Sequence, residues 1–404
     1  MLLIAQDFTG CNEFRSDGLL IWSVTQVPDN MIHVIFTLDY EIHGNGEGSP
    51  YELMVEPTDR MLGQFDRYGA KLTILADVAE ILKFREYGGG TTQDKFHYRK
   101  IEAQLRKAIQ GGHDVQLHLH PSYFNTQHDG DRWRMDWSEY DFATLAPDRM
   151  RSMLRAGRDY LETLLRPVDG NYRCNVFRAA NWAVQPSPNV VRALIESGFV
   201  VDTSVFKYGQ RAGRVNFDYS HAPSAVLPWR ASEKDICVED PEGRLWEAPI
   251  YCEQRWLGAF LTVNRLYRVW QSHRHKFPKP GREGPAAGSN ETNAGYGTPR
   301  ASLWDRFFNI AWKADFNQCS GRQLAGALKR VERLYGNARA EVPFVLIGHS
   351  KLFTPYNETS LAPFLKFVAS HPPKYCFSRF GNMHWENGSK DIPQITGSPL
   401  PSHG

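Results

Sequence analysis

A chain of 404 residues is long enough for one large domain or two ordinary ones with a sizeable core. Its 42% hydrophobic and 23% charged residues are those of a soluble globular protein. The formal charge of +2 gives no bulk electrostatic reason to expect a nucleic acid or an anionic membrane as partner. The six cysteines are scattered without a CxxC pair, which argues against a disulfide framework and against a zinc–thiolate site.

Both ends of the chain and one internal segment are expected to lie outside the folded domain. Residues 1–30 predict an N-terminal extension that lacks the basic and apolar regions of a secretory signal, and no window is apolar enough to span a membrane. A cytoplasmic protein with reduced thiols is therefore expected. Residues 31–385 predict the domain, with a flexible insertion rich in Gly, Pro and Asn at 276–300. A disordered tail is expected over residues 386–404.

Apolar, β-branched runs alternate along this domain with segments of helical period. In chain order, the expected strands are Ile32–Leu38, Lys71–Asp77, His113–His120, Asn175–Trp182, Gly198–Phe206, Arg244–Tyr251, Val342–Ser350 and Tyr375–Asn382. Helices are expected over residues 57–69 and 101–109, from Pro147, over 189–196, and after Ser320, where Ser-x-x-Gln has the spacing of a capping box. This alternation predicts an α/β fold with a parallel sheet, and seven or eight strands favour a barrel over an open sheet.

Polar side chains follow the expected strands at their carboxyl ends, where both architectures place functional sites. Asp39 and Glu41 end the first strand as Asp-x-Glu, and residues two apart in an extended chain point the same way. One carboxylate could bind a divalent metal while the other acts as a general base. The structural alternative is that Asp39 caps the following turn and Glu41 is solvated.

The segment GGHDVQLHLHPSY contains three histidines. His118 and His120 lie two apart at a strand end, so their imidazoles can converge on one metal ion. Two histidines and a carboxylate leave coordination positions open, as catalytic rather than structural metal sites do. His113 lies at the opposite end of the strand, which favours a structural role.

Four further polar residues end later strands. Arg178 could pair with a carboxylate and keep it ionised, or form an ordinary surface salt bridge. Asp202 could orient a histidine or an arginine, or cap the turn that follows it. Glu247 ends the sixth strand. His349 follows four apolar residues and is well placed as a general acid. Together, these strand ends offer the residues that metal-assisted hydrolysis requires.

The aromatic content has two explanations, a large core and a protein that handles sugars. The chain has 11 Trp and 17 Tyr residues, more than a minimal core needs, and aromatic faces stack on pyranose rings. A large core explains the same surplus. Trp182 lies just after Arg178, and Trp133 and Trp137 lie in a long polar loop. These three tryptophans and Glu247 are the candidate substrate-binding residues.

The order of these motifs resembles the polysaccharide deacetylase superfamily, also called NodB-homology or carbohydrate esterase 4 proteins. The matching pieces are FTLDYE, GHDVQLHLHP, FRAANW, GFVVDTS and VLIGHS, which occur in the family's order between residues 32 and 380. Segments like GHDVQLHLHP are closest to a WalW-like subgroup associated with surface-polysaccharide gene sets. Two features depart from the family: Glu41 stands where Asp is usual, and the two histidines are spaced two apart instead of four.

The resemblance implies a distorted (β/α)7 TIM-like barrel, a divalent metal that is most commonly zinc, and deacetylation of N-acetyl sugars. It also implies roles for individual residues. Asp39 would be the base, held by Arg178. Glu41 would bind the metal together with His118 and His120. His349 would be the acid, with Asp202 tuning it.

Two other functions remain open at this point. One is a glycosidase in which Asp39 or Glu41 faces Glu247 across the barrel as the second carboxylate. The other is a barrel that binds a glycan without chemistry, with a degenerate metal site. The carbohydrate substrate is common to all three functions.

Overall fold

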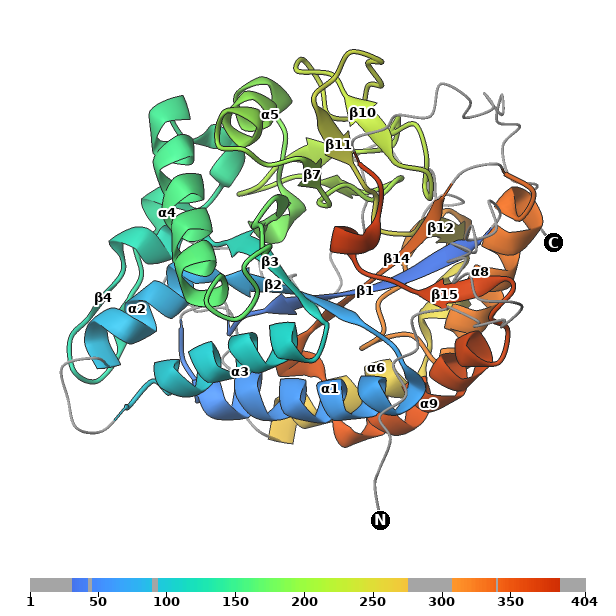
Figure 1. The fold of residues 1–404 in the computed structure, drawn as a ribbon, viewed down its shortest axis with the longest axis horizontal. Coiled ribbons are helices and arrows are strands. Elements are labelled where there is room, and N and C mark those ends of the chain that lie inside the picture. Colours follow the sequence, from blue (N-terminus) through green and yellow to red (C-terminus); the bar gives the residue numbers. More distant parts are fainter. Residues whose placement is uncertain (1–30, 43–45, 89–93, 275–306, 339–340, 386–404) are drawn as a thin grey trace, which may run out of the picture.

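The computed structural model describes residues 31–42, 46–88, 94–274, 307–338 and 341–385. The expected N-terminal extension (1–30), flexible insertion (276–300) and disordered tail (386–404) lie outside the described residues. The described chain forms one central sheet with helices packed around it (Figure 1).

Seven parallel strands form the body of the central sheet, in the spatial order β11-β7-β6-β3-β2-β1-β14. Their bounds are β1 Ile32–Tyr40, β2 Leu72–Asp77, β3 Asp114–Leu119, β6 Val176–Ala179, β7 Val201–Asp202, β11 Leu245–Glu247 and β14 Val342–His349. Two more strands extend it: β10 (Trp229–Ala231) runs antiparallel to β11, and β15 (Tyr375–Phe377) pairs in parallel with β1. All eight strands expected from the sequence are therefore present, with shorter bounds in most cases.

The sheet curls so that its two ends approach each other (Figure 1). The chain after β11 crosses the gap: Ile250 N donates to Val205 O at 2.9 Å, and Tyr251 N donates to Val345 O of β14 at 3.0 Å. Side chains inside the curl form an apolar cluster of Ile35, Val176, Val201, Ala248, Val345, Phe380 and Met383. The fold is therefore α/β with a curled half-barrel sheet. In the described part of the chain β11 and β14 are not paired with each other, so strand pairing does not close the sheet, and the distorted (β/α)7 TIM-like barrel stays a prediction.

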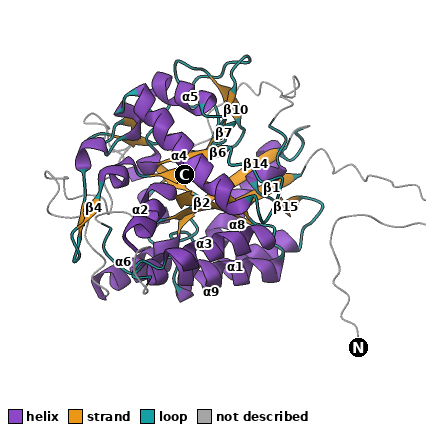
Figure 2. Ribbon diagram, turned by 60° about the vertical axis from the view of Figure 1, so that its left-hand side comes forward, coloured by secondary structure: helices purple, strands orange, loops and turns teal. Residues whose placement is uncertain are grey.

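Helices cover the outer face of the curl, as the two views in Figures 1 and 2 show. Their bounds are α1 Glu56–Tyr68, α2 Val78–Gly88, α3 Tyr98–Gln110, α4 Pro147–Leu165, α5 Ser187–Glu196, α6 Val263–Arg274, α8 Gly321–Tyr335 and α9 Pro355–Ala369. The sequence signals at helix ends are confirmed: Gly69 ends α1 with a left-handed φ of 70°, and Ser320 and Gln323 form a capping box before α8.

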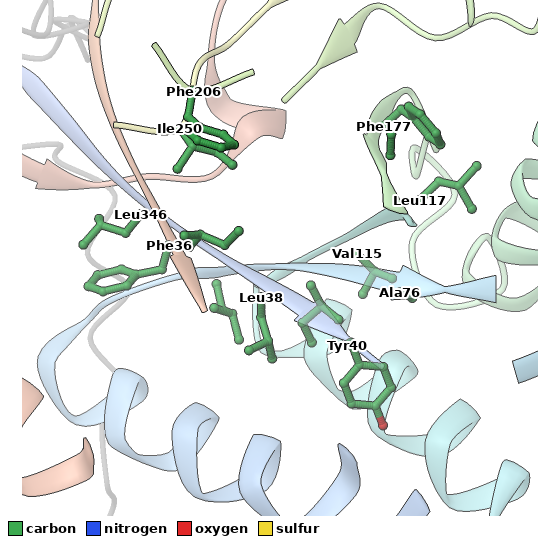
Figure 3. Packing of buried hydrophobic residues seen from close by; sticks show 14 of the residues in the cluster. Phe36, Leu38, Tyr40, Ala76, Val115, Leu117, Phe177, Phe206, Ile250 and Leu346 are labelled. Atoms are coloured by element: carbon green, nitrogen blue, oxygen red, sulfur yellow. The ribbon is translucent and has the colours of Figure 1, made fainter. Parts of the chain in front are cut away.

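Strand alternation separates the core from the functional site. Phe36, Leu38 and Tyr40 of β1 are fully buried among the side chains under the helices (Figure 3). Thr37 and Asp39 point the other way, into the curl, where both contact Arg178. Because alternate residues of a strand face opposite sides, the Asp-x-Glu and His-x-His pairs each present both side chains to the interior of the curl.

Candidate active site

The carboxyl ends of β1, β2, β3, β6 and β14 bring the polar residues together. The strand register places Asp39 opposite His349, Asp77 opposite His118, and His118 opposite Arg178. Parallel strands that start at one edge of the sheet also end at one edge, so acids and bases separated by more than 300 residues of sequence meet there.

Glu41, His118 and His120 form a buried group that could hold a metal ion. One oxygen of Glu41, Oε2, lies 3.2 Å from His118 Nε2 and 3.2 Å from His120 Nδ1. The two imidazole rings are 4.9 Å apart and nearly perpendicular. The spacing of two along the strand, which departs from the resembled family, therefore still directs both rings to the same carboxylate oxygen.

The second nitrogen of His118 is held by the protein backbone. His118 Nδ1 donates to Arg178 O at 2.9 Å, so Nε2 of the neutral ring carries the free lone pair and faces Glu41. Burial opposes a charge on this ring, but the hydrogen bond to Glu41 and the charges of Asp39, Glu41 and Asp77 raise its pKa to about 9. The surroundings of His118 therefore favour a cation at this position.

Asp77 supports the other histidine. Its Oδ2 lies 2.8 Å from His120 Nδ1, and its Oδ1 accepts from the backbone N–H of His120 at 3.2 Å. Asp77 contacts Nδ1, the same nitrogen that faces Glu41, so Nε2 is the nitrogen of the neutral His120 ring that remains to bind a metal. Asp77 was not predicted as part of the site, although it ends the expected strand Lys71–Asp77 just as Asp39 follows the first expected strand.

Asp39 is paired with a buried arginine. Arg178 is fully buried, and its Nη1 donates to Asp39 Oδ1 at 2.7 Å and to Thr37 Oγ1 at 2.9 Å. Arg178 Nε also donates to Thr203 O at 2.9 Å. Burial alone would raise the pKa of Asp39, but Arg178, His118 and His349 together hold it below its usual value. Asp39 is thus an ionised carboxylate and a potential proton acceptor.

His349 lies on the other side of Asp39. Its Nε2 is 3.5 Å from Asp39 Oδ2 and 4.0 Å from Glu41 Oε1. Its backbone N–H donates to Asn317 Oδ1 at 2.6 Å, and within the described chain its buried Nδ1 has no hydrogen-bond partner. Burial lowers the pKa of His349, although Asp39 and Glu41 act in the opposite direction, so the resting imidazole is neutral near pH 7.

Lys351 is a second residue that the sequence analysis missed. Its Nζ donates to Glu41 Oε1 at 2.9 Å and to Ile42 O at 3.0 Å. The two oxygens of Glu41 are thereby divided: Oε1 faces the lysine, and Oε2 faces the two histidines. A lysine two residues after a histidine does not by itself indicate a partner, so the contact between Lys351 and Glu41 had no signal in the sequence.

Asp202 and Glu247 lie together below the site. They are opposite each other in the register of β7 and β11, and both are fully buried. Asp202 accepts from the backbone N–H and the hydroxyl of Ser204, and Glu247 accepts from Val205 N at 3.1 Å. Burial and the neighbouring Asp202 raise the pKa of Glu247 well above its usual value. The structure places these two acids in a buried hydrogen-bonded pair, with Asp202 in the turn-capping position rather than behind His349.

The three tryptophans lie in different environments. Trp182 is half-buried beside His349, with ring centroids 6.1 Å apart, and Lys313 Nζ lies 3.3 Å from the centroid of its indole ring. Trp133 is buried in an aromatic cluster with Phe84 and Phe96, where it serves the core. Trp137 is partly buried and packs on Tyr140, whose hydroxyl donates to Asn181 Oδ1, next to Trp182, at 3.3 Å. Trp182 is the one of the three whose ring lies beside a residue of the candidate site, His349.

His113 has the structural position expected for it. Its Nδ1 accepts from the backbone N–H of Leu72 at 3.1 Å, and its Nε2 lies 3.2 Å from Asp66 Oδ1. Burial lowers the pKa of His113 to about 4. The ring is therefore neutral and holds the start of β2 to the start of β3.

A second group of potential metal ligands lies elsewhere in the described chain. His221, Asp235 and Cys237 bring their ligand atoms close together, and His221 Nε2 is 3.1 Å from Asp235 Oδ2. His221 is half-exposed, whereas Glu41, His118 and His120 are all buried. Any measurement of metal content must distinguish these two groups.

Comparison with known proteins gives alignments only at low similarity. No protein-family model and no curated protein matches the chain. Solved structures that align with it include a proposed polysaccharide deacetylase from Mycobacterium smegmatis, with 14% identity, 91% of this chain and 93% of that chain covered, and a TM-score of 0.40. The PuuE allantoinase has 15% identity, 88% and 89% coverage and a TM-score of 0.43. A 4-alpha-glucanotransferase from Thermococcus litoralis has 12% identity, 87% and 39% coverage and a TM-score of 0.46.

Polysaccharide deacetylases are thus among the solved structures that align with this chain. At these identities and TM-scores, the alignments do not assign an activity to the chain, and the site geometry alone supports a function. No helix in the described residues has the length and apolar character needed to cross a membrane.

Proposed function

We propose that this protein is a metal-dependent hydrolase of the polysaccharide deacetylase type, which removes an N-acyl group, acetyl in the first instance, from a sugar or polysaccharide. The proposal is supported mainly by one observation, the close arrangement of three kinds of side chain. A buried carboxylate and two imidazoles that could bind a metal lie beside a carboxylate kept ionised by a buried arginine. A histidine lies on the other side of that carboxylate.

The donor set fits a divalent metal. Glu41, His118 and His120 would hold it, and two nitrogens with one oxygen are ligands that zinc accepts while leaving positions open. The backbone contact of His118 Nδ1 and the Asp77 contact of His120 Nδ1 are hydrogen bonds of the kind that orient metal-binding imidazoles, and they leave Nε2 of each ring to bind the metal. Bound there, zinc supplies a Lewis acid that activates water and polarises the acyl carbonyl.

Asp39 acts as the general base in this proposal. Its low pKa keeps it ionised at neutral pH, and Arg178 fixes its orientation through Oδ1. The other oxygen, Oδ2, faces His349 and remains directed into the site. Asp39 accepts a proton from the attacking water as the bond from the water oxygen to the acyl carbon forms.

His349 acts as the general acid that protonates the departing amine. Because its resting imidazole is neutral, it must first gain a proton within the catalytic cycle. Asp39 Oδ2, 3.5 Å from Nε2, is the neighbouring group that has just accepted one. The proton taken from water thus passes from Asp39 to His349 and then to the amine nitrogen as the carbon–nitrogen bond breaks. Trp182 borders His349 and forms part of the substrate-facing wall.

Several finer assignments go with this proposal. Membership of a WalW-like subgroup, a distorted (β/α)7 TIM-like barrel and a role in surface-polysaccharide biosynthesis are supported by the quoted motifs. A cytoplasmic location is supported by the cysteines: the five in the described residues are all unpaired, and four of them are buried.

The glycosidase alternative has less support from the geometry. It needs a second ionisable carboxylate facing Asp39 or Glu41, whereas Glu247 is fully buried beside Asp202, and both its burial and this neighbour raise its pKa well above its usual value. A barrel that binds glycans without chemistry is the remaining alternative. A barrel that only binds glycans requires no general base, whereas Asp39, kept ionised by the buried Arg178, has the properties of one.

The test is acetate release from N-acetylated oligosaccharides by purified protein, with and without a chelator. The proposal expects release that stops on chelation and returns when zinc is added. Hydrolysis of glycosidic bonds that survives the chelator would instead favour the two-carboxylate mechanism. Glycan binding without acetate release, in protein that holds no metal, would favour the non-catalytic barrel.

A further inference from the structure

Exposed apolar side chains are concentrated in one region of the described chain. Of the large apolar residues that are strongly exposed, eight belong to residues 256–270 and 307–308: Trp256, Leu257, Leu261, Val263, Leu266, Trp270, Phe307 and Phe308. We refer to these eight residues as the apolar patch. On α6, Val263, Leu266 and Trp270 are spaced three and four residues apart, so they share one helix face. Single exposed apolar residues are common on protein surfaces, but a group of eight such residues is typical of an interaction site.

The sequence around the apolar patch is basic. From Gln254 to Arg274, where α6 ends, there are four Arg residues and no Asp or Glu, and one of the four, Arg255, pairs with Glu253 just before the segment. The whole chain has a formal charge of only +2, so the rest of the chain is net acidic. Within the described residues of this region, Arg265 packs over the Phe260 ring at 4.6 Å. An apolar stripe on a helix in a segment with only basic charges is typical of helices that lie in a membrane interface.

The start of α6 is attached to the same end of the fold as the active site. Asn264 Nδ2 donates to Cys319 O at 2.8 Å, and Thr262 Oγ1 donates to Gln318 O at 2.7 Å. The adjacent Asn317 accepts the backbone N–H of His349. The ring of Tyr267 also packs on Tyr356, at the start of α9, with centroids 5.4 Å apart. The apolar patch therefore adjoins the face on which the catalytic strand ends open.

We propose that the apolar patch docks the protein onto the surface of an anionic lipid bilayer, with α6 lying in the interface. Tryptophan prefers the headgroup level of a bilayer, and the exposed leucines supply apolar area to bury there. The basic charges complement anionic headgroups. The described helices are too short or too polar to cross the bilayer, so the protein would lie on it.

A second copy of the chain is a poorer occupant of the same surface. A two-fold dimer places the same patch on both sides of the interface, so basic segments without acidic residues would face each other. Like charges brought together in this way oppose association, whereas an anionic bilayer neutralises them. The charge pattern thus selects the lipid surface.

The experiment is co-sedimentation of the full chain with vesicles of phosphatidylcholine alone or of phosphatidylcholine with 30% phosphatidylglycerol. We expect binding to the anionic vesicles that weakens as salt is raised, and at least tenfold weaker binding to the neutral ones. The double variant Leu266→Glu, Trp270→Glu should lose at least tenfold in binding. The matched control is Leu334→Glu, which changes another half-exposed leucine on α8 and should bind as the unchanged protein does.

Three results would overturn the inference: no vesicle binding at low salt, equal binding to neutral and anionic vesicles, or unchanged binding by the double variant. A dimer that the double variant converts to a monomer, without vesicle binding, would assign the patch to a second copy instead. Circular dichroism checks that each variant is folded. None of these outcomes depends on the proposed hydrolase activity, because acetate release from a soluble oligosaccharide is measured separately and should not change in the double variant.

Discussion

Replacing Asp39 by asparagine removes the negative charge that faces Arg178 and keeps the shape of the side chain. The structure gives two expected effects. The first is on catalysis: an amide cannot accept the proton from water, so acetate release should fall by about 10²–10⁴-fold. The metal should remain bound, because Glu41, His118 and His120 are unchanged.

The second effect is on stability. Arg178 is fully buried, and its Nη1 is 2.7 Å from Asp39 Oδ1. Removing one partner of a buried ion pair leaves an uncompensated charge, which costs about 3–5 kcal/mol. Thr37 and Thr203 continue to accept hydrogen bonds from the guanidinium, so we expect a loss in free energy of unfolding near the lower end, about 3 kcal/mol.

The assay combines acetate release, metal content by elemental analysis and urea unfolding on the same preparation. Thr37→Val is the matched control, because it removes a hydrogen bond to Arg178 but leaves the charge pair and the proposed base in place. It should lose about 1–3 kcal/mol of stability while keeping most of its activity. An Asp39→Asn protein that binds metal and turns over within threefold of the unchanged protein would refute the role given to Asp39.

Three further predictions follow from other residues. His349→Gln should retain metal and lose about 10²–10⁴-fold in acetate release, and unchanged turnover would remove His349 from the mechanism. Glu247→Gln should keep activity and lose no more than about 1 kcal/mol of stability, because burial and Asp202 already disfavour the charged form of Glu247; loss of all activity with the fold intact would revive the two-carboxylate mechanism. The pKa of His113 is about 4 in the folded protein and about 6.5 in the unfolded chain. Between pH 6.5 and pH 4 the unfolded chain therefore binds a proton that the folded protein does not. The free energy of unfolding should fall by about 2–3 kcal/mol as the pH drops from 6.5 to 4. His113→Asn should reduce that pH dependence in urea unfolding, and an unaltered slope would show that other groups cause it.

The sequence predicted the strands well because each is a short β-branched run that ends in polar residues. The register that brings Asp39 opposite His349 follows once such strands are parallel and neighbouring. Helix α9 was missed because its apolar residues do not follow one clear stripe, and Pro363 interrupts the pattern. Helix α2 was missed because it begins at Val78, directly after β2 ends at Asp77, without a turn to mark the boundary.

The site was predicted in part, and the reasons differ between residues. His118 and His120 could be identified because alternation in a strand fixes which side they share. Contacts between side chains on different strands could not be read from the sequence, so the roles of Asp77 and Lys351 were missed. The environment of Trp133 depends on three-dimensional packing against other aromatic rings, which no local pattern reveals.

The most direct test of the proposed function is the metal stoichiometry of the purified protein compared with that of His118→Ala, measured together with acetate release. We predict that one equivalent of divalent metal and the chelator-sensitive activity are both lost in His118→Ala, while Cys237→Ser, at the second group of potential ligands, keeps the activity. A His118→Ala protein with unchanged metal content and unchanged acetate release would contradict the metal site formed by Glu41, His118 and His120.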